Sequence, residues 1–167
     1  MSNEELGTIR RIPGPVGGQF EARLTRHFDQ DQSTLWAWLT KPSHLVEWLA
    51  PGEIELRLGG AAKLNFTDSG IVIDSTVTAL DPPRLLEYSW SGPGEPSRPV
   101  RWETAPEAGG TRLTLTLRVP ENEDVARSCA GWEAHLQMLL AAIEGVPIKF
   151  PFERFKETRA AYKAMLG

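Results

Sequence analysis

DVARSCAGWEAHLQMLLAAIE, residues 124–144, is the longest stretch of the chain in which apolar residues recur at helical spacing. Steps of three and four place them in one broad stripe on a helix. Asp124 is suited to cap the first turn, and Gly145 and Pro147 to end the helix. At 1.5 Å per residue the helix is about 30 Å long, so another part of the fold must cover the stripe over that length. Its members are Val125, Cys129, Trp132, Leu136, Leu139, Leu140 and Ile143.

In residues 19–28 and again in residues 52–120 the pattern changes, and apolar residues alternate with polar ones as in strands with one buried face. Turn sequences such as Gly59-Gly60 and DPPR separate the runs. Short connections predict antiparallel pairing, and one-sided alternation predicts a sheet whose dry face the long helix covers. The runs comprise 19–28, 53–58, 62–66, 71–79, 86–90, 100–104 and 113–119.

Two short helices are predicted within DQDQSTLWAWLTKPSHLVEWLAPG, residues 29–52, where Pro42 separates them. Asp29, Asp31 or Ser33 is suited to cap the first. Neither helix is long enough to cross a sheet, so we expect the pair to close one end of it.

The length of 167 residues predicts one α+β domain. Residues 1–18 are expected to form an N-terminal arm or edge hairpin and residues 19–145 the central domain. Residues 146–167 are expected to form a helical extension that packs on this domain, with a dimer contact as the alternative.

The formal net charge of −4 argues against a nucleic-acid partner, which would require a basic patch. Cys129 is the single cysteine, so no intramolecular disulfide is possible. The first residues lack the basic and apolar regions of a signal peptide, and no apolar run approaches the 18 or so residues of a membrane span. We therefore expect a cytoplasmic protein without membrane insertion.

The order of elements resembles the helix-grip superfamily, also called START-like or SRPBCC, in which a curved antiparallel sheet of about seven strands grips a long C-terminal helix. Five stretches are similar to bacterial homologues of the activator of the heat-shock-protein-90 ATPase. They are GTIRR (7–11), LWAWLTKPSHLVEWL (35–49), DPPRLLEYSW (81–90), GGTRLTLT (109–116) and AGWEAHLQMLLAAIEG (130–145). The resemblance covers nearly the whole chain, from residue 7 to about residue 160, and implies the helix-grip fold. For most such homologues it implies no established ligand or reaction.

Catalytic and metal-binding motifs are absent from the sequence. His27, His44 and His135 are far apart, and neither HExxH nor CxxC spacing occurs. The nucleophile elbow GxSxG and the phosphate-binding loops are also missing. We expect no metal, no cofactor and no catalytic residue.

Apolar residues from the sheet, the short helices and the long helix are predicted to line a ligand cavity. The alternative interpretation is that these side chains fill the core. The candidates are Trp48, Phe66, Ile73, Trp90, Trp102, Trp132, Leu136 and Leu139.

Polar residues at strand positions that face the core need hydrogen-bond or ionic partners, because burying a polar group unpaired costs free energy. Arg26, Ser75 and Thr104 are such residues. Arg26 is placed to bind a ligand carboxylate, and the alternative is that it pairs with an internal acid. His135 lies beside the helical stripe, so it either hydrogen-bonds a ligand or is an ordinary core or surface histidine.

Three functional hypotheses follow. The first is a non-enzymatic binding module for a small hydrophobic or amphipathic molecule, with a cavity of a few hundred Å³ that opens near Trp48. The second is an interaction protein that binds a chaperone or a second copy through an exposed apolar patch around Phe152 and Phe155. The third is a polyketide cyclase-like or hydrolase-like enzyme, which requires an acid and a base in the pocket.

Overall fold

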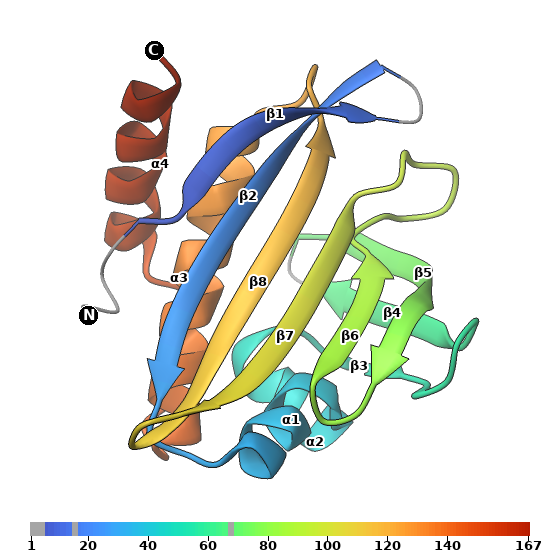
Figure 1. Ribbon diagram of the computed structural model, residues 1–167, viewed down its shortest axis with the longest axis vertical. Helices are drawn as coiled ribbons and strands as arrows, with labels where there is room; N and C mark the ends of the chain where they lie inside the picture. The colour runs from blue at the N-terminus through green and yellow to red at the C-terminus, as the bar shows by residue number, and fades with distance from the viewer. Residues whose placement is uncertain (1–5, 15–16, 67–68) are drawn as a thin grey trace.

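The long helix lies against one face of an antiparallel sheet in the computed structural model, which describes residues 6–14, 17–66 and 69–167 (Figure 1). This helix, α3, spans Val125–Ile143. A carboxylate oxygen of Asp124 accepts a hydrogen bond from the backbone N–H of Arg127 at 3.0 Å. Gly145 has a φ of +82°, in the left-handed region that favours glycine after a helix. Both predicted ends of the helix are confirmed.

The sheet contains eight strands in the order β1-β2-β8-β7-β6-β5-β4-β3, each antiparallel to its neighbours. The sequence predicted about seven; the additional strand, β1, pairs with β2 at one edge of the sheet. The α+β helix-grip fold is otherwise as predicted. The bounds are β1 Thr8–Gly14, β2 Gly17–Phe28, β3 Gly52–Ile54, β4 Ala61–Phe66, β5 Ile71–Asp81, β6 Leu85–Ser89, β7 Pro99–Glu107 and β8 Gly110–Pro120.

The predicted strand at 53–58 is wrong in its second half, since β3 ends at Ile54. The backbone N–H of Arg57 donates to the carbonyl of Glu55, and that of Gly60 donates to the carbonyl of Arg57. These bonds fold residues 55–60 into turns, which leave Leu58 65% exposed. Alternation of apolar residues therefore continued past the end of the strand.

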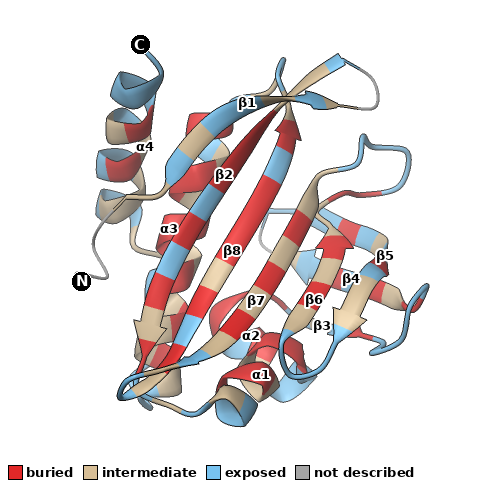
Figure 2. Ribbon diagram, viewed as in Figure 1, coloured by how far each residue is buried: buried red, intermediate tan, exposed pale blue. Residues whose placement is uncertain are grey.

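The core lies between the sheet and α3, where buried residues alternate with exposed ones along the central strands (Figure 2). On β2, Ala22 and Leu24 are buried whereas Arg23 is exposed. On β8, Leu115 and Leu117 occupy the same face. The strands thus have one dry face, as their period of two predicts.

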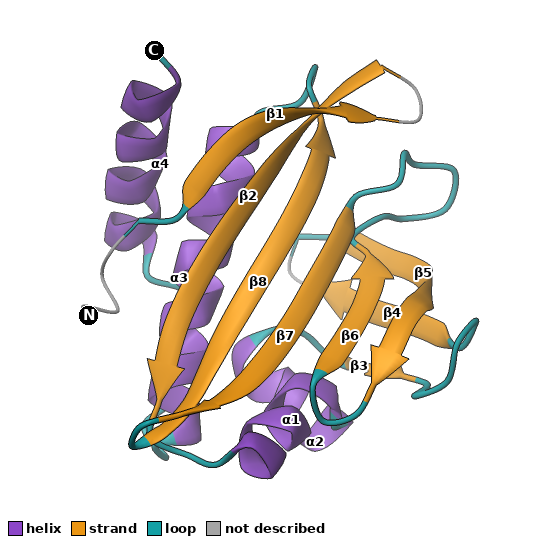
Figure 3. Cartoon of the chain, viewed as in Figure 1, coloured by secondary structure: helices purple, strands orange, loops and turns teal. Residues whose placement is uncertain are grey.

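Helices α1, Gln32–Thr40, and α2, Pro42–Trp48, lie at the lower end of the sheet as viewed (Figure 3). Asp31 caps α1 by accepting a hydrogen bond from the N–H of Thr34 at 2.9 Å. The indole N–H of Trp48 donates to the carbonyl of Trp38 at 2.9 Å and so ties the end of α2 to α1.

The last helix, α4, spans Phe152–Leu166 and lies beside α3 (Figure 1). Arg159 of α4 forms an ion pair of 2.7 Å with Asp124 at the start of α3. Within the described ranges, no helix has the length and apolar character needed to span a membrane.

Candidate functional site

A continuous group of aromatic rings runs between the sheet and α3. Trp102 of β7 contacts both Trp48 of α2 and Trp132 of α3, with ring centroids 5.8 and 5.4 Å apart. Trp132 also meets Trp90, which follows β6, at 4.7 Å. These pairs meet edge to face, an arrangement that aromatic quadrupoles favour. The rings therefore fill the space in which the sequence predicted a cavity.

The group reaches the surface beside the loop that joins α3 to α4. Phe66 at the end of β4 contacts His135 of α3, with ring centroids 5.9 Å apart. His135 also meets Phe150 of the loop at 5.5 Å, and Phe150 meets Phe152 at 4.9 Å. Phe66, His135 and Phe150 are partly exposed, and Phe152 is 66% exposed. We call Phe66, Trp90, His135 and Phe150 the aromatic mouth.

His135 is the polar group of the aromatic mouth. Its Nδ1 lies 3.0 Å from the backbone carbonyl oxygen of Trp48. Because a carbonyl can only accept, Nδ1 carries the proton, and Nε2 of the neutral ring is an acceptor. Burial among the rings lowers the pKa of His135, although the bond to Trp48 acts in the opposite direction. The imidazole is therefore neutral at pH 7, and Nε2 has no hydrogen-bond partner among the residues described.

The structure divides the predicted ligand-binding residues into two groups. Phe66, Ser75, Trp90 and His135 are partly exposed. The others are buried, and they comprise Arg26, Trp48, Ile73, Trp102, Trp132, Leu136 and Leu139. Trp48 is only 1% exposed. Contact with solvent is thus made at the aromatic mouth and not, as predicted, near Trp48.

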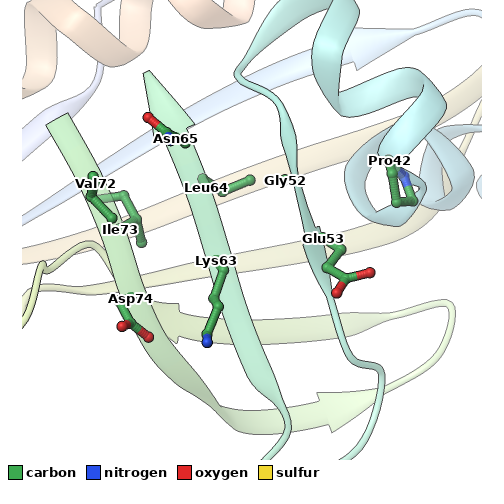
Figure 4. Close-up of a pocket in the computed structure, with 9 residues that line it drawn as sticks. All are labelled: Pro42, Gly52, Glu53, Lys63, Leu64, Asn65, Val72, Ile73 and Asp74. Atoms are coloured by element: carbon green, nitrogen blue, oxygen red, sulfur yellow. The ribbon is translucent and has the colours of Figure 1, made fainter. Parts of the chain in front are cut away.

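Neither of two hollows on the described surface lies between α3 and the sheet. One, of about 460 Å³, lies on β3, β4 and β5 next to the start of α2 (Figure 4). Lys63 stands there between Glu53 and Asp74 on the neighbouring strands. The other, of about 440 Å³, lies over β2, β8 and β7. A ligand that entered between α3 and the sheet at Trp132 would have to displace the rings that contact it.

The polar candidates of the strands all have protein partners. The hydroxyl of Ser75 donates to the carbonyl of Ser89 at 2.7 Å. Thr104 donates to the carbonyl of Pro83 at 2.6 Å and accepts from the side chain of Gln32. These hydroxyls connect neighbouring segments of the fold.

Arg26 pairs with Glu133 of α3, and both side chains are buried. An internal acid was the alternative considered for this arginine. The hydroxyl of Tyr162 in α4 donates to the other carboxylate oxygen of Glu133. The same hydroxyl accepts a hydrogen bond from the backbone N–H of Gly7 at 2.8 Å. Arg154 lies 3.5 Å from Glu133. The network joins both ends of the described chain to the middle of α3.

Glu133 and Tyr162 were missed by the sequence reasoning, although a signal for Glu133 existed. Glu133 follows Cys129 by four residues and precedes Leu136 by three, so it falls within the apolar stripe of the helix. A carboxylate in that phase must be buried and requires a cation. Arg26, the single cation in the dry phase of the first strand, was the matching signal.

Metal-binding groups and titratable side chains of the described residues were the features needed for the predicted alternative of an enzyme. The described part of the chain contains no group of three or more histidine, cysteine or acidic side chains that could hold a metal ion. Burial raises the pKa of the Cys129 thiol to about 12, and the charge of Glu133 adds to the effect, so the nucleophilic thiolate is absent at pH 7. Glu133 and Tyr162 are each 0% exposed and therefore closed to a substrate.

Comparisons with known proteins agree with this fold. A family model described as Activator of Hsp90 ATPase homolog 1-like protein matches residues 29–144. The crystal structure of CalU16 from Micromonospora echinospora has a TM-score of 0.80, with 24% identity over 95% of each chain. A conserved protein of unknown function from Enterococcus faecalis, EF2215, has a TM-score of 0.77, with 20% identity over 96% of this chain and 92% of the other.

A further solved structure is that of the protein encoded by gene BPP1335 from Bordetella parapertussis. It has a TM-score of 0.72 and is 26% identical over 86% of this chain and 84% of its own. A search of curated proteins gives no match.

Proposed function

The chain belongs to the activator of Hsp90 ATPase homolog 1-like family, and we propose that it is a non-enzymatic binding module for a small hydrophobic or amphipathic molecule. The observation that carries the proposal is His135 in the aromatic mouth. A partly exposed imidazole with an unpartnered acceptor nitrogen is surrounded there by apolar rings. Binding sites for small molecules commonly combine an apolar lining with a few oriented polar groups.

Entry of the ligand requires the rings of Phe66 and Phe150 to separate from His135. An aromatic pair contributes about 0.5–1.5 kcal/mol beyond the area that it buries. The apolar face of a ligand would replace these contacts, so the net cost of opening is small. Trp132, Leu136 and Leu139 then form the deeper lining, whereas Arg26 does not contribute because Glu133 neutralises it.

The protonation of His135 restricts the polar group of the ligand. Because Nδ1–H is committed to Trp48, the ring offers only the acceptor Nε2. A ligand with a hydroxyl or amide N–H can donate to this nitrogen, whereas an ether of the same shape cannot. We therefore propose an aromatic or polycyclic molecule that carries a hydrogen-bond donor.

Titration with 2-naphthol and with 2-methoxynaphthalene tests this proposal. We expect saturable changes in the NMR signals of the Trp90 and Trp132 indole N–H groups and tighter binding of the naphthol. The preference is about fivefold, since one neutral hydrogen bond contributes about 1 kcal/mol. His135→Phe should abolish the preference, and the matched variant His44→Phe, on α2, should retain it. Unchanged indole signals at saturating probe would refute the binding site.

The stability of the protein should depend on His135 as the pH falls. The lowered pKa means that the unfolded chain binds a proton between the folded-state pKa and about 6.5, while the folded protein does not. This contribution to stability is therefore fully present above pH 6.5 and lost as the pH falls through the folded-state pKa. Urea denaturation at pH 7.5 and pH 5 should show a larger loss for the wild type than for His135→Phe. Equal losses would contradict the assignment.

A second candidate function, docking to a chaperone, is favoured by the exposed loop between α3 and α4. Val146 is 64% exposed, Ile148 37% and Phe152 66%, and such apolar groups mark interaction surfaces. Phe152→Ser should then reduce capture of full-length Hsp90, with Val46→Ser on α2 as the exposed apolar control. Absence of capture by the wild type would count against this function.

A further inference from the structure

The outer face of the sheet, opposite to α3, carries a hollow of about 440 Å³ that is unrelated to the aromatic mouth. It is lined by charged and hydroxyl side chains from three neighbouring strands and the turn before β6. Those that matter here are Arg23, Thr25, Arg84, Glu103, Arg112 and Thr114. Arg84 already pairs with Asp81 at 2.5 Å, which leaves Arg23 and Arg112 against Glu103. The lining is therefore basic on a chain whose formal net charge is −4.

The strand register places two of the arginines on either side of a pair of hydroxyls. Thr25 of β2 lies directly opposite Thr114 of β8. The neighbouring pair on one side of these threonines is Arg23 and Thr116, and the neighbouring pair on the other side is His27 and Arg112. Four residues of strand separate the outer pairs, so the two arginine Cα atoms are about 14 Å apart. Side chains of this length can both reach toward the threonines between them.

Arg23 and Arg112 differ from the other arginines on this face because the structure pairs them with no acid among its described residues. Arg10 and Arg118 both pair with Glu21, at 2.7 and 2.9 Å. Arg101 pairs with Glu87 at 2.9 Å. Inside the hollow, Arg84 pairs with Asp81. The guanidinium groups of Arg23 and Arg112 therefore remain available to an anion.

A hydroxyl and a carboxylate beside the hollow also lack partners. Thr116, between Arg23 and Arg101 in its row, is 8% exposed, and its hydroxyl has no hydrogen-bond partner in the part of the chain described. A buried hydroxyl without a partner is unfavourable, so a polar group of a ligand beside Thr116 would supply the hydrogen bond that the protein does not. Glu103 has no ion pair among these residues, so the site also offers one acceptor.

We propose that this hollow binds a small organic molecule with two acidic groups, one paired with Arg23 and the other with Arg112. Guanidinium groups bind carboxylates and phosphates through two parallel hydrogen bonds, and the hydroxyls of Thr25 and Thr114 donate to the centre of the molecule. Glu103 favours a ligand that also carries a hydroxyl group. A hydroxylated dicarboxylic or tricarboxylic acid has this combination of groups.

Citrate is the probe for this site, with acetate as the single-acid comparison, both titrated at constant ionic strength set with NaCl. We expect citrate to cause saturable changes in the NMR signals of Thr25 and Thr114, and acetate to bind at least tenfold more weakly. Arg23→Gln and Arg112→Gln should each weaken citrate binding up to about fivefold, which corresponds to the upper end for an exposed ion pair. Binding of 2-naphthol should be unchanged in both variants.

Arg127→Gln is the matched control, because Arg127 is exposed on α3 and its replacement removes the same charge. This variant should bind citrate as the wild type does. Three results would overturn the proposal: no saturable change at Thr25 and Thr114, equal affinity for acetate, or equal weakening by Arg127→Gln. None of them bears on the aromatic mouth, which lies on the other side of the sheet.

Discussion

Glu133→Leu should lower the free energy of unfolding by about 3–5 kcal/mol, the cost of leaving one partner of a buried ion pair without the other. Arg26 is 3% exposed and Glu133 0%, so the arginine in the variant can neither reach water nor find another acid nearby. The hydroxyl of Tyr162 also loses its acceptor. Urea denaturation at pH 7 measures the change directly.

The double variant Arg26→Leu/Glu133→Leu distinguishes loss of pairing from loss of packing. Removing both charges leaves no uncompensated ion, so most of the lost stability should return. Glu157→Leu, an exposed position on α4, should change the stability by less than about 0.5 kcal/mol. A double variant no more stable than Glu133→Leu alone would show that the ion pair is not the cause.

Trp132→Ala should lower the free energy of unfolding by about 3–5 kcal/mol, as truncation of a buried tryptophan leaves a cavity. Trp132 is 5% exposed and contacts Trp90 and Trp102. Indole should enter the space and restore stability by about 2.7 kcal/mol at a hundred times its dissociation constant. Thermal unfolding with and without indole measures both effects.

The comparison with the wild type determines whether indole occupies the new space. Because the rings of the wild type fill the region already, indole should stabilise it much less than the variant. Gln137→Ala, at an exposed position of α3, should change stability little and gain nothing further from indole. Equal stabilisation of wild type and Trp132→Ala by indole would place its binding elsewhere.

Most of the fold could be predicted from the sequence because periodicity reports burial. The stripe on α3 and the alternation along β2 and β8 each identified a dry face, and caps and turn residues gave their ends. Leu56 and Leu58 show the limit of this reasoning. Their alternation suggested a longer strand, but pairing with a neighbour decides where a strand ends, and residues 55–60 form turns instead.

The candidate site could be predicted less completely than the fold. The chemistry of a side chain shows that it needs a partner when buried, but not which residue is that partner. The polarity of Arg26 was visible in the sequence, whereas its pairing with Glu133 spans 107 positions. Trp48, Trp102 and Trp132 meet between the helix and the sheet. Whether such rings leave a cavity or fill it depends on their packing, which no sequence period encodes.

The bond between Gly7 and Tyr162 has a consequence for the order of events during synthesis. Its two residues are 155 positions apart, and a ribosome adds roughly 5–20 residues per second. At that rate Gly7 is made roughly 8–31 s before Tyr162, and Glu133, 29 positions from Tyr162, roughly 1–6 s before it. Until Tyr162 is made, β1 can pair with β2, but the carboxylate of Glu133 lacks its hydroxyl partner, which only α4 supplies.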